Sequence, residues 1–257
     1  MKLNTYRGRF KRLLTGSVCA LTVMAGSTAM AQIAQFPSGA PQPQRWAGAP
    51  NWSGIWERDG DNVWDNRIPA GIVQVAPYNE EYTRRRADPE HQPKVGLFNS
   101  MPGVMNMLYP MDLQISPMQV TILTENGSSR RIVTDGRVHS EDTLSTPMGH
   151  SVGRWVRGEL HVETCCISAD TALPGWGPHS ESMVIKERFY LRNNKTLVDE
   201  ITVEDPEAFT QAWCTEKIWY RRPDWEPVTN PRDENDRDAV GDTGAPAEGG
   251  RARPNEN

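Results

Sequence analysis

The stretch that decides the fold is SVGRWVRGELHVET, residues 151–164. Apolar and polar residues alternate on both sides of Arg157-Gly158, and a two-residue connection between alternating segments is typical of a tight β-hairpin. We therefore predict antiparallel strands at Ser151–Val156 and Glu159–Thr164. In the second strand the apolar residues share one face, so His161 on the opposite face is predicted to be a surface residue.

Similar turn signals lie on both sides of this hairpin. Downstream, Asn193-Asn194 separates two alternating segments and Asp205-Pro206 leads into a last one; upstream, Asn126-Gly127-Ser128 separates two more. Asn and Gly accept the positive φ values that such turns require. The predicted strands are Trp52–Arg58, Met118–Thr124, Arg130–Thr134, Ser151–Val156, Glu159–Thr164, Glu181–Leu191, Thr196–Glu204 and Ala208–Tyr220.

These strands predict an all-β fold, a single antiparallel barrel. Eight strands in succession are the number that closes a small up-and-down barrel around side chains or one small ligand, so we predict an eight-stranded barrel. A short helix is predicted at Pro77–Ala87, where a proline stands in the first turn. Methionines gathered between residues 101 and 118 predict an apolar segment over one barrel end, either a packed loop or a lid over an aromatic ligand. Met105 and Tyr109 in this segment are candidates for ligand contact.

The two ends of the chain differ from the predicted barrel domain, residues 51–222. Residues 1–31 combine basic residues, an apolar stretch and an Ala-Met-Ala site before Gln32, a pattern typical of a secretory signal peptide. Residues 32–50 are predicted to be an extended leader, and residues 223–257, which are poor in apolar side chains, a disordered tail. We therefore predict a periplasmic or secreted protein without membrane contact after cleavage.

Composition excludes several kinds of partner. The chain has 257 residues, a formal net charge of −5 and no basic run interleaved with aromatic residues, so nucleic acid is not an expected partner. No glycine-rich loop joins a strand to a helix, so no nucleotide cofactor is predicted. Beyond the signal peptide the cysteines are Cys165, Cys166 and Cys214. They permit one disulfide, for which Cys214 and one of the adjacent pair are the candidates. A homodimer is compatible with the sequence.

The strand predicted over residues 179–191 carries the most informative polar side chains. Because side chains alternate between the two faces of a strand, His179, Glu181 and Glu187 share the more apolar face, which should point into the barrel. Charges in apolar surroundings must be paired, hydrogen-bonded or shifted in pKa, and general acid–base catalysis uses such surroundings. A structural ion pair with an arginine is the alternative.

Further candidates lie in and around the hairpin of residues 151–164. The same alternation places His150 and Arg154 together, with His150 directed into the barrel. Asp135 and Gly136 predict a turn after a strand, so Arg137 and His139 should lie at the barrel rim, where barrels admit ligands. Asp135 could orient His139 or simply close the turn. Arg137 and Arg154 are the arginines that would pair with inward carboxylates or stabilise an anion.

The same histidines are candidates for a metal site. His139, His150, His179 and Glu181 could supply three imidazoles and one carboxylate. No His-x-His, His-Glu-x-x-His or Cys-x-x-Cys spacing is present, and such local spacing is the usual signature of a zinc site. We therefore predict no bound metal.

Five short motifs carry a resemblance to a known family. They are NWSGIW at residues 51–56, TDGRVH at 134–139, GHSVGRW at 149–155, GELHVET at 158–164 and the strand containing HSE and ERF at 179–189. Together they resemble a large family of exported bacterial proteins, most without assigned function. The resemblance covers about residues 50–222 and implies a lipocalin-like (calycin) barrel. Within that family the chain is similar to cofactor-independent hydrolytic enzymes that cleave β-aryl ethers of lignin-derived dimers.

The resemblance and the acid–base residues give one functional hypothesis, an exported enzyme without a cofactor that acts on a small aromatic molecule. For an aryl ether, a base would promote departure of the aryloxide, an acid would protonate it, and water would complete hydrolysis. The catalytic candidates are His139, His150, His179 and Glu181, and the substrate-binding candidates are Arg137, Arg154, Glu187, Met105 and Tyr109.

Two hypotheses from other classes stay open. One is a non-catalytic carrier of a small apolar ligand, and the other is a structural envelope protein. Lipocalin-like barrels serve catalysis and transport alike, so the fold does not choose between them. Inward-facing imidazole and carboxylate groups would count against both.

Overall fold

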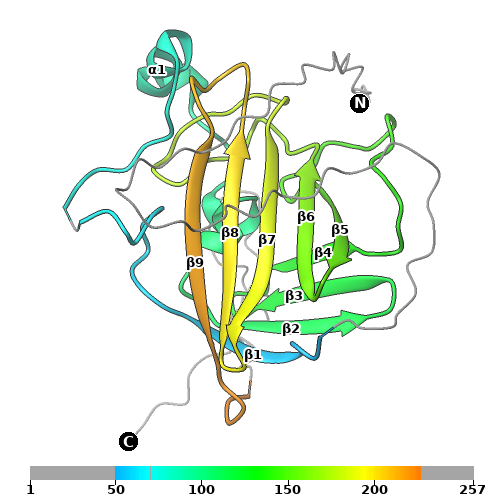
Figure 1. Cartoon of the computed structure of the whole chain (residues 1–257). Helices are drawn as coiled ribbons and strands as arrows, with labels where there is room; N and C mark the ends of the chain where they lie inside the picture. The colour runs from blue at the N-terminus through cyan, green and yellow to red at the C-terminus, as the bar shows by residue number, and fades with distance from the viewer. Residues whose placement is uncertain (1–49, 70, 227–257) are drawn as a thin grey trace, which may run out of the picture.

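The computed structural model describes residues 50–69 and 71–226. The predicted signal peptide, nearly all of the predicted leader and the predicted tail beyond residue 226 lie outside the described residues. Within them the chain is mostly β-structure, and the strands form a closed barrel (Figure 1).

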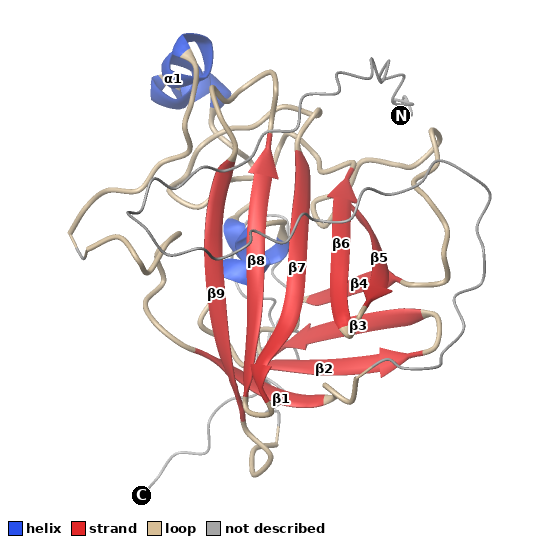
Figure 2. Ribbon diagram, viewed as in Figure 1, coloured by secondary structure: helices blue, strands red, loops and turns tan. Residues whose placement is uncertain are grey.

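Nine strands, not eight, make up the barrel. Each pairs with its neighbours in chain order, and β9 closes the barrel by pairing with β1. Figure 2 shows β7, β8 and β9 running side by side, with β2 and β3 crossing them steeply on another part of the wall. The strands are β1 (Gly54–Arg58), β2 (Met111–Ser116), β3 (Gln119–Thr124), β4 (Ser129–Val133), β5 (His150–Val156), β6 (Glu159–Cys165), β7 (Val184–Asn193), β8 (Thr196–Glu204) and β9 (Trp213–Arg221).

The strand that was not predicted from the sequence is β2. Its residues alternate as a half-buried strand should, with Met111 and Leu113 buried and Gln114 exposed. The prediction of a continuous methionine-rich loop over the barrel end was therefore wrong for Met111–Ser116. These residues instead bridge β1 and β3 and pair with both.

One strand pair departs from the predicted antiparallel order. β4 and β5 are parallel, with Ile132 opposite Ser151. Parallel neighbours require a connection that returns the chain to the end where the first strand began, and residues 134–149 make that return. The other strand pairs are antiparallel, and the predicted hairpin at Arg157-Gly158 is confirmed. Arg157 adopts a positive φ of 53° in that turn.

Helices are few and short. Helix α1 (Glu80–Ala87) confirms the predicted helix but begins later than Pro77, because the Asn79 side chain accepts a hydrogen bond from the Tyr82 backbone N–H and caps the first turn. The remaining turns are η1 (Pro89–His91), η2 (Leu97–Asn99) and the fully buried α2 (Gly103–Asn106). No helix among the described residues is long and apolar enough to cross a membrane.

The barrel interior is packed with large apolar side chains. Burying such side chains is the main favourable contribution to folding, at about 25 cal/mol per Å² of apolar surface. Charged side chains are nevertheless buried as well: Arg130, Glu187, Asp199 and Lys217 are each at most 2% exposed. The largest fully buried apolar residues are Trp52, Trp56, Met101, Met105, Met111, Phe189 and Trp219.

Candidate functional site

The register of β5 and β6 decides which polar side chains point into the barrel. Ser151 is opposite Thr164, and both are buried inside the barrel, where Arg130 donates hydrogen bonds to both hydroxyls. Because side chains alternate, His150 and Arg154 must point to the outer face. The prediction that His150 faces the interior with Arg154 beside it was therefore wrong.

The inner face of β5 is hard to recognise in the sequence because it carries few aliphatic residues. Gly153 belongs to it, and a Cβ there would come within 2.8 Å of the Ile132 side chain. Trp155 fills the neighbouring space and meets Trp52 edge-on, with the ring centroids 5.0 Å apart. A small residue and a large aromatic thus pack the interior, while the more aliphatic face lies outside.

A cluster of ionisable side chains forms on the outer face, where β5 and β6 meet the loop of residues 134–149. The Nδ1 atoms of His139 and His150 lie 2.8 Å apart, and the His139 Nε2 atom is 3.7 Å from a carboxylate oxygen of Glu163. His139 and Glu163 are partly exposed. We call His139, His150 and Glu163 the histidine cluster. The structure thus brings together two of the predicted catalytic residues.

Burial sets the protonation of the histidine cluster. Desolvation, with a smaller contribution from His150, lowers the pKa of His139 to about 4. Desolvation and the positive charge of Arg137 lower the pKa of His150. Burial also raises the pKa of Glu163. Both imidazoles are therefore neutral at pH 7, the form in which histidine can accept a proton.

The contact between the two imidazoles restricts where their protons can lie. Two Nδ1 atoms at hydrogen-bond distance need one donor and one acceptor. The Nε2 atom of His139 has no hydrogen-bond partner among the described residues, but the Glu163 carboxylate 3.7 Å away favours a proton on it electrostatically. We therefore assign the lone pair of His139 to its Nδ1 atom. His150 then donates through Nδ1, and its Nε2 atom is left without a proton. The arrangement makes His150 a base.

Arg137 places positive charge beside this base. Its guanidinium group is bonded bidentately to Asp135, and the Asp135 carboxylate also accepts the Arg137 backbone N–H. Asp135 therefore closes the predicted turn and holds Arg137 rather than orienting His139. Hydrogen bonds from Arg137 lower the pKa of Asp135. The Arg137 side chain is 49% exposed and so remains accessible to an anionic group.

A second polar group lies inside the barrel, and we call it the interior ion pair. Arg130 of β4 donates to both carboxylate oxygens of Glu187, one at 2.7 Å, and also to Thr164 at 3.1 Å. The hydroxyls of Ser151 and Thr164 are 2.8 Å apart. The prediction that Glu187 lies inside the barrel is confirmed, but its partner is Arg130 rather than Arg137 or Arg154.

Asp199 and Lys217 are neighbours across β8 and β9, and both are buried. Neither Asp199 oxygen has a hydrogen-bond partner among the described residues. Burial and the charge of Glu187 raise the pKa of Asp199 well above its usual range. Burial beside a second carboxyl group therefore favours the protonated form of Asp199.

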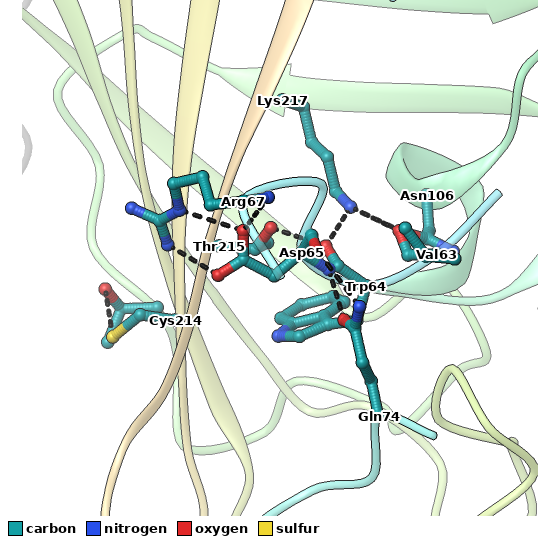
Figure 3. A network of polar contacts seen from close by, with 10 residues as sticks. Val63, Trp64, Asp65, Arg67, Gln74, Asn106, Cys214, Thr215 and Lys217 are labelled. Atoms are coloured by element: carbon teal, nitrogen blue, oxygen red, sulfur yellow. Dashed lines mark hydrogen bonds and ion pairs between the residues drawn. The ribbon is translucent and has the colours of Figure 1, made fainter. Parts of the chain in front are cut away.

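Lys217 of β9 binds the segment that contains Trp64. Its Nζ atom donates to the Asn106 side chain at 2.7 Å and to the carbonyls of Val63, at 3.0 Å, and Trp64 (Figure 3). Thr215 donates to the same Trp64 carbonyl. Burial lowers the pKa of Lys217 to about 6. Three oxygen atoms surround the Nζ atom, so we interpret Lys217 as an anchor of this segment.

His179 and Glu181 do not join the histidine cluster. β7 begins only at Val184, so the alternation assumed for residues 179–183 does not hold. Instead, Asp205 accepts hydrogen bonds from the backbone and hydroxyl of Ser180 and turns the segment away. His179 is buried between Thr171, at 2.7 Å, and the Ser180 carbonyl, and burial lowers its pKa. Glu181 is exposed, so the prediction that it lies inside the barrel was wrong.

The remaining predicted residues are scattered. Met105 is buried in α2, whereas Tyr109 is exposed. Arg154 lies opposite His161 on the outer face. The prediction that His161 is a surface residue was wrong, because it is only 3% exposed and its Nε2 atom is 3.1 Å from Glu159. Its other strand neighbour is Arg188, so long side chains flank the ring on both sides.

Two further findings concern cofactors and disulfides. Within residues 50–69 and 71–226, no group of three or more His, Cys, Asp or Glu side chains is placed to hold a metal ion. Cys165 and Cys166 are both free thiols, so the disulfide considered between one of them and Cys214 does not form.

Comparison with known proteins adds no assignment. Neither the protein-family models, nor the curated proteins, nor the solved structures contain a match to this chain. The function must therefore be argued from the residues themselves.

Proposed function

We propose that this protein is an exported, cofactor-independent enzyme that cleaves a small aromatic substrate by general acid–base catalysis at the histidine cluster. The reaction class we propose is hydrolysis of a lignin-type β-aryl ether. One observation carries the proposal: the two imidazoles lie in direct contact, with the half-buried His150 beside the accessible charge of Arg137. Because both rings are neutral and one must donate to the other, one of them keeps an unprotonated nitrogen, which we assign to His150.

The cluster offers a complete proton cycle for such a hydrolysis. The Nε2 atom of His150 takes a proton from water as the water oxygen bonds to the substrate carbon. The bond between that carbon and the aryloxy oxygen breaks, and Arg137 stabilises the departing aryloxide. The proton on His150 then passes to the aryloxide, which gives one alcohol and one phenol and restores the imidazole. A base positioned in this way contributes about 10²–10⁴-fold in rate.

His139 and Glu163 act on this base without touching the substrate. His139 accepts the hydrogen bond from the Nδ1 atom of His150 and so fixes the ring orientation. Glu163 lies on the far side of His139 and favours the positive charge that builds up on the pair when His150 takes the proton. We therefore regard His150 as the catalytic residue and His139 and Glu163 as positioning residues.

The test is turnover of a fluorogenic β-aryl ether by the purified protein without added cofactor. His150→Asn should lower kcat by about 10²–10⁴-fold and leave the melting temperature nearly unchanged. The matched control is His91→Asn, because His91 is an exposed histidine that also contacts a carboxylate, that of Asp88 at 2.8 Å. Wild-type turnover in the His150 variant, or equal losses in both variants, would overturn the proposal.

A carrier of a small ligand is the second candidate, and one observation favours it. The buried Asp199 carboxyl group has no hydrogen-bond partner among the described residues, and the indole N–H groups of Trp64 and Trp219 also lack one. A ligand inside the barrel would satisfy such groups. Titration with an aromatic ligand, followed by tryptophan fluorescence, distinguishes the two candidates: a carrier binds tightly and releases the ligand unchanged.

A further inference from the structure

Two adjacent cysteines end the strand that also carries Glu163. Cys165 is the last residue of β6 and Cys166 follows it; both are free thiols. Cys165 is buried, whereas Cys166 is partly exposed and has a positive φ of 57°. Such a backbone is uncommon for a residue other than glycine, so the surrounding contacts must hold it in place.

Those contacts come from the segment just before His150. The Cys166 carbonyl accepts hydrogen bonds from the Thr146 backbone N–H at 3.0 Å and from the Ser145 hydroxyl at 3.3 Å. Gly149 packs against the other carbonyl: a Cβ at this residue would lie 2.5 Å from the Cys165 oxygen. The cysteine pair is thus braced against residues 145–149.

The two thiols differ in reactivity. The Cys165 thiol donates a hydrogen bond to the Cys166 sulfur, which lowers the pKa of Cys166, whereas this bond and burial raise the pKa of Cys165. The thiolate is the nucleophile in thiol–disulfide exchange. Cys166 is therefore suited to attack an external disulfide, and Cys165 is held next to it as the second thiol.

We propose that Cys165 and Cys166 form a redox-active vicinal dithiol that is oxidised by small-molecule disulfides. The Cys166 thiolate attacks one sulfur of the disulfide RSSR, the S–S bond breaks, and RS⁻ leaves. The Cys165 thiol passes its proton to this departing RS⁻, and its sulfur then attacks the Cys166 sulfur and displaces the second RS⁻, which takes up a proton from water. Overall, one RSSR is reduced to two RSH, and the two cysteines are oxidised to one disulfide.

Geometry makes this disulfide readily reversible. Cα atoms of consecutive residues are about 3.8 Å apart across a trans peptide, whereas ordinary disulfides join Cα atoms about 4.4–6.8 Å apart. A bond between neighbours is therefore strained, and strained, accessible disulfides are the labile ones with more oxidising potentials. The pair would respond to its redox surroundings rather than act as a permanent crosslink.

Ring closure must also alter the backbone at Cys166, because the two side chains have to turn toward each other. The hydrogen bonds from Thr146 and Ser145 depend on the position of that carbonyl. Oxidation should therefore loosen residues 145–149 and speed hydrogen exchange at the Thr146 amide. This consequence does not depend on the proposed enzymatic activity.

The experiment treats the folded protein with oxidised glutathione, alkylates the remaining thiols and maps the products by mass spectrometry. The expected product is a peptide containing Cys165 and Cys166 that is lighter by two hydrogen atoms, carries no glutathione and no alkyl group, and returns to the dithiol with dithiothreitol. A stable glutathione adduct on the wild type, an intermolecular crosslink, or two alkylated cysteines would overturn the proposal.

Two matched variants separate the roles of the thiols. Cys165→Ser should trap a glutathione adduct on Cys166, because the second thiol is missing. Cys166→Ser should form no adduct, because the Cys165 thiol is buried. Melting curves establish that both variants are folded. The opposite pattern, with an adduct only in the Cys166 variant, would show that Cys165 is the attacking thiol and would overturn the assignment of roles.

Discussion

The interior ion pair and the histidine cluster occupy opposite faces of the same part of the barrel wall. Inside, Arg130 and Glu187 are almost fully buried and bonded to each other, with Thr164 accepting a further hydrogen bond from Arg130. Outside, the partly exposed His139 and His150 are neutral, and their mutual contact uses only one nitrogen of each ring. The buried charges of Arg130 and Glu187 are thus engaged with each other, whereas the half-buried imidazoles can still accept a proton.

The largest expected effect follows from breaking the interior ion pair. Glu187→Ala leaves the Arg130 charge buried without its carboxylate, and removing one partner of a buried pair costs about 3–5 kcal/mol. Urea unfolding should show this loss in the free energy of unfolding. Glu181→Ala is the matched control, because Glu181 is exposed and should cost less than about 1 kcal/mol. Equal losses in the two variants would contradict the assigned positions.

A smaller effect is expected when both partners are replaced together. Arg130→Met combined with Glu187→Leu removes both charges and fills the space with apolar side chains, while the Ser151 and Thr164 hydroxyls can still bond to each other. Such replacements are often neutral or stabilising by about 1–4 kcal/mol. The double variant should therefore recover the stability lost in Glu187→Ala. It should also keep wild-type turnover, which would fail if the interior ion pair took part in catalysis.

The histidine cluster predicts a pH dependence of stability with a definite sign. The pKa of His139 is about 4 in the folded protein and about 6.5 in an unfolded chain, so between these values the unfolded chain binds more protons. Stability is therefore lost as the pH falls from about 6.5 to about 4, by up to about 1.4 kcal/mol per pH unit.

His139→Asn should remove this contribution, which is measured as the difference between wild-type and variant unfolding free energies across the pH range. Taking the difference cancels the titration of carboxyl groups that both proteins share. His91→Asn should leave the slope as in the wild type. An identical slope in wild type and His139→Asn would show that His139 is not desolvated in solution.

The hairpins of this fold could be predicted because turn residues signal them locally. Arg157-Gly158 and Asn126-Gly127 mark turns whose backbone needs positive φ, and both turns connect paired strands. The strand Met111–Ser116 was missed although its residues alternate, because the methionine content favoured a loop. Alternation is therefore a better guide to this strand than its methionine content.

The site was harder to predict because it depends on which face of β5 is the inner one. Glu187 was placed correctly, since its strand alternates clearly between apolar and polar residues. For β5, Gly153 and Trp155 fill the interior, and neither makes its face look aliphatic. The pairing of Arg130 with Glu187 and the approach of Glu163 to His139 depend on strand register, which no local pattern in the sequence reveals.

The smallest expected effect concerns Arg137, whose charge reaches the histidine cluster from an exposed side chain. This positive charge contributes to the lowered pKa of His150, second to burial, so Arg137→Gln should raise that pKa. Interactions of exposed charges are worth about 0.2–1 kcal/mol, or less than about one pH unit. NMR titration of the His150 ring measures the shift directly.

High salt provides the control for the Arg137 prediction. In about 1 M salt, where the screening length falls to about 3 Å, the His150 rings of wild type and Arg137→Gln should titrate alike. A difference that persists in high salt would mean that Arg137 acts on His150 through a direct contact, not across solvent. The interior ion pair should respond differently, because salt screens buried charges much less than exposed ones. The difference in unfolding free energy between wild type and Glu187→Ala should therefore persist in about 1 M salt.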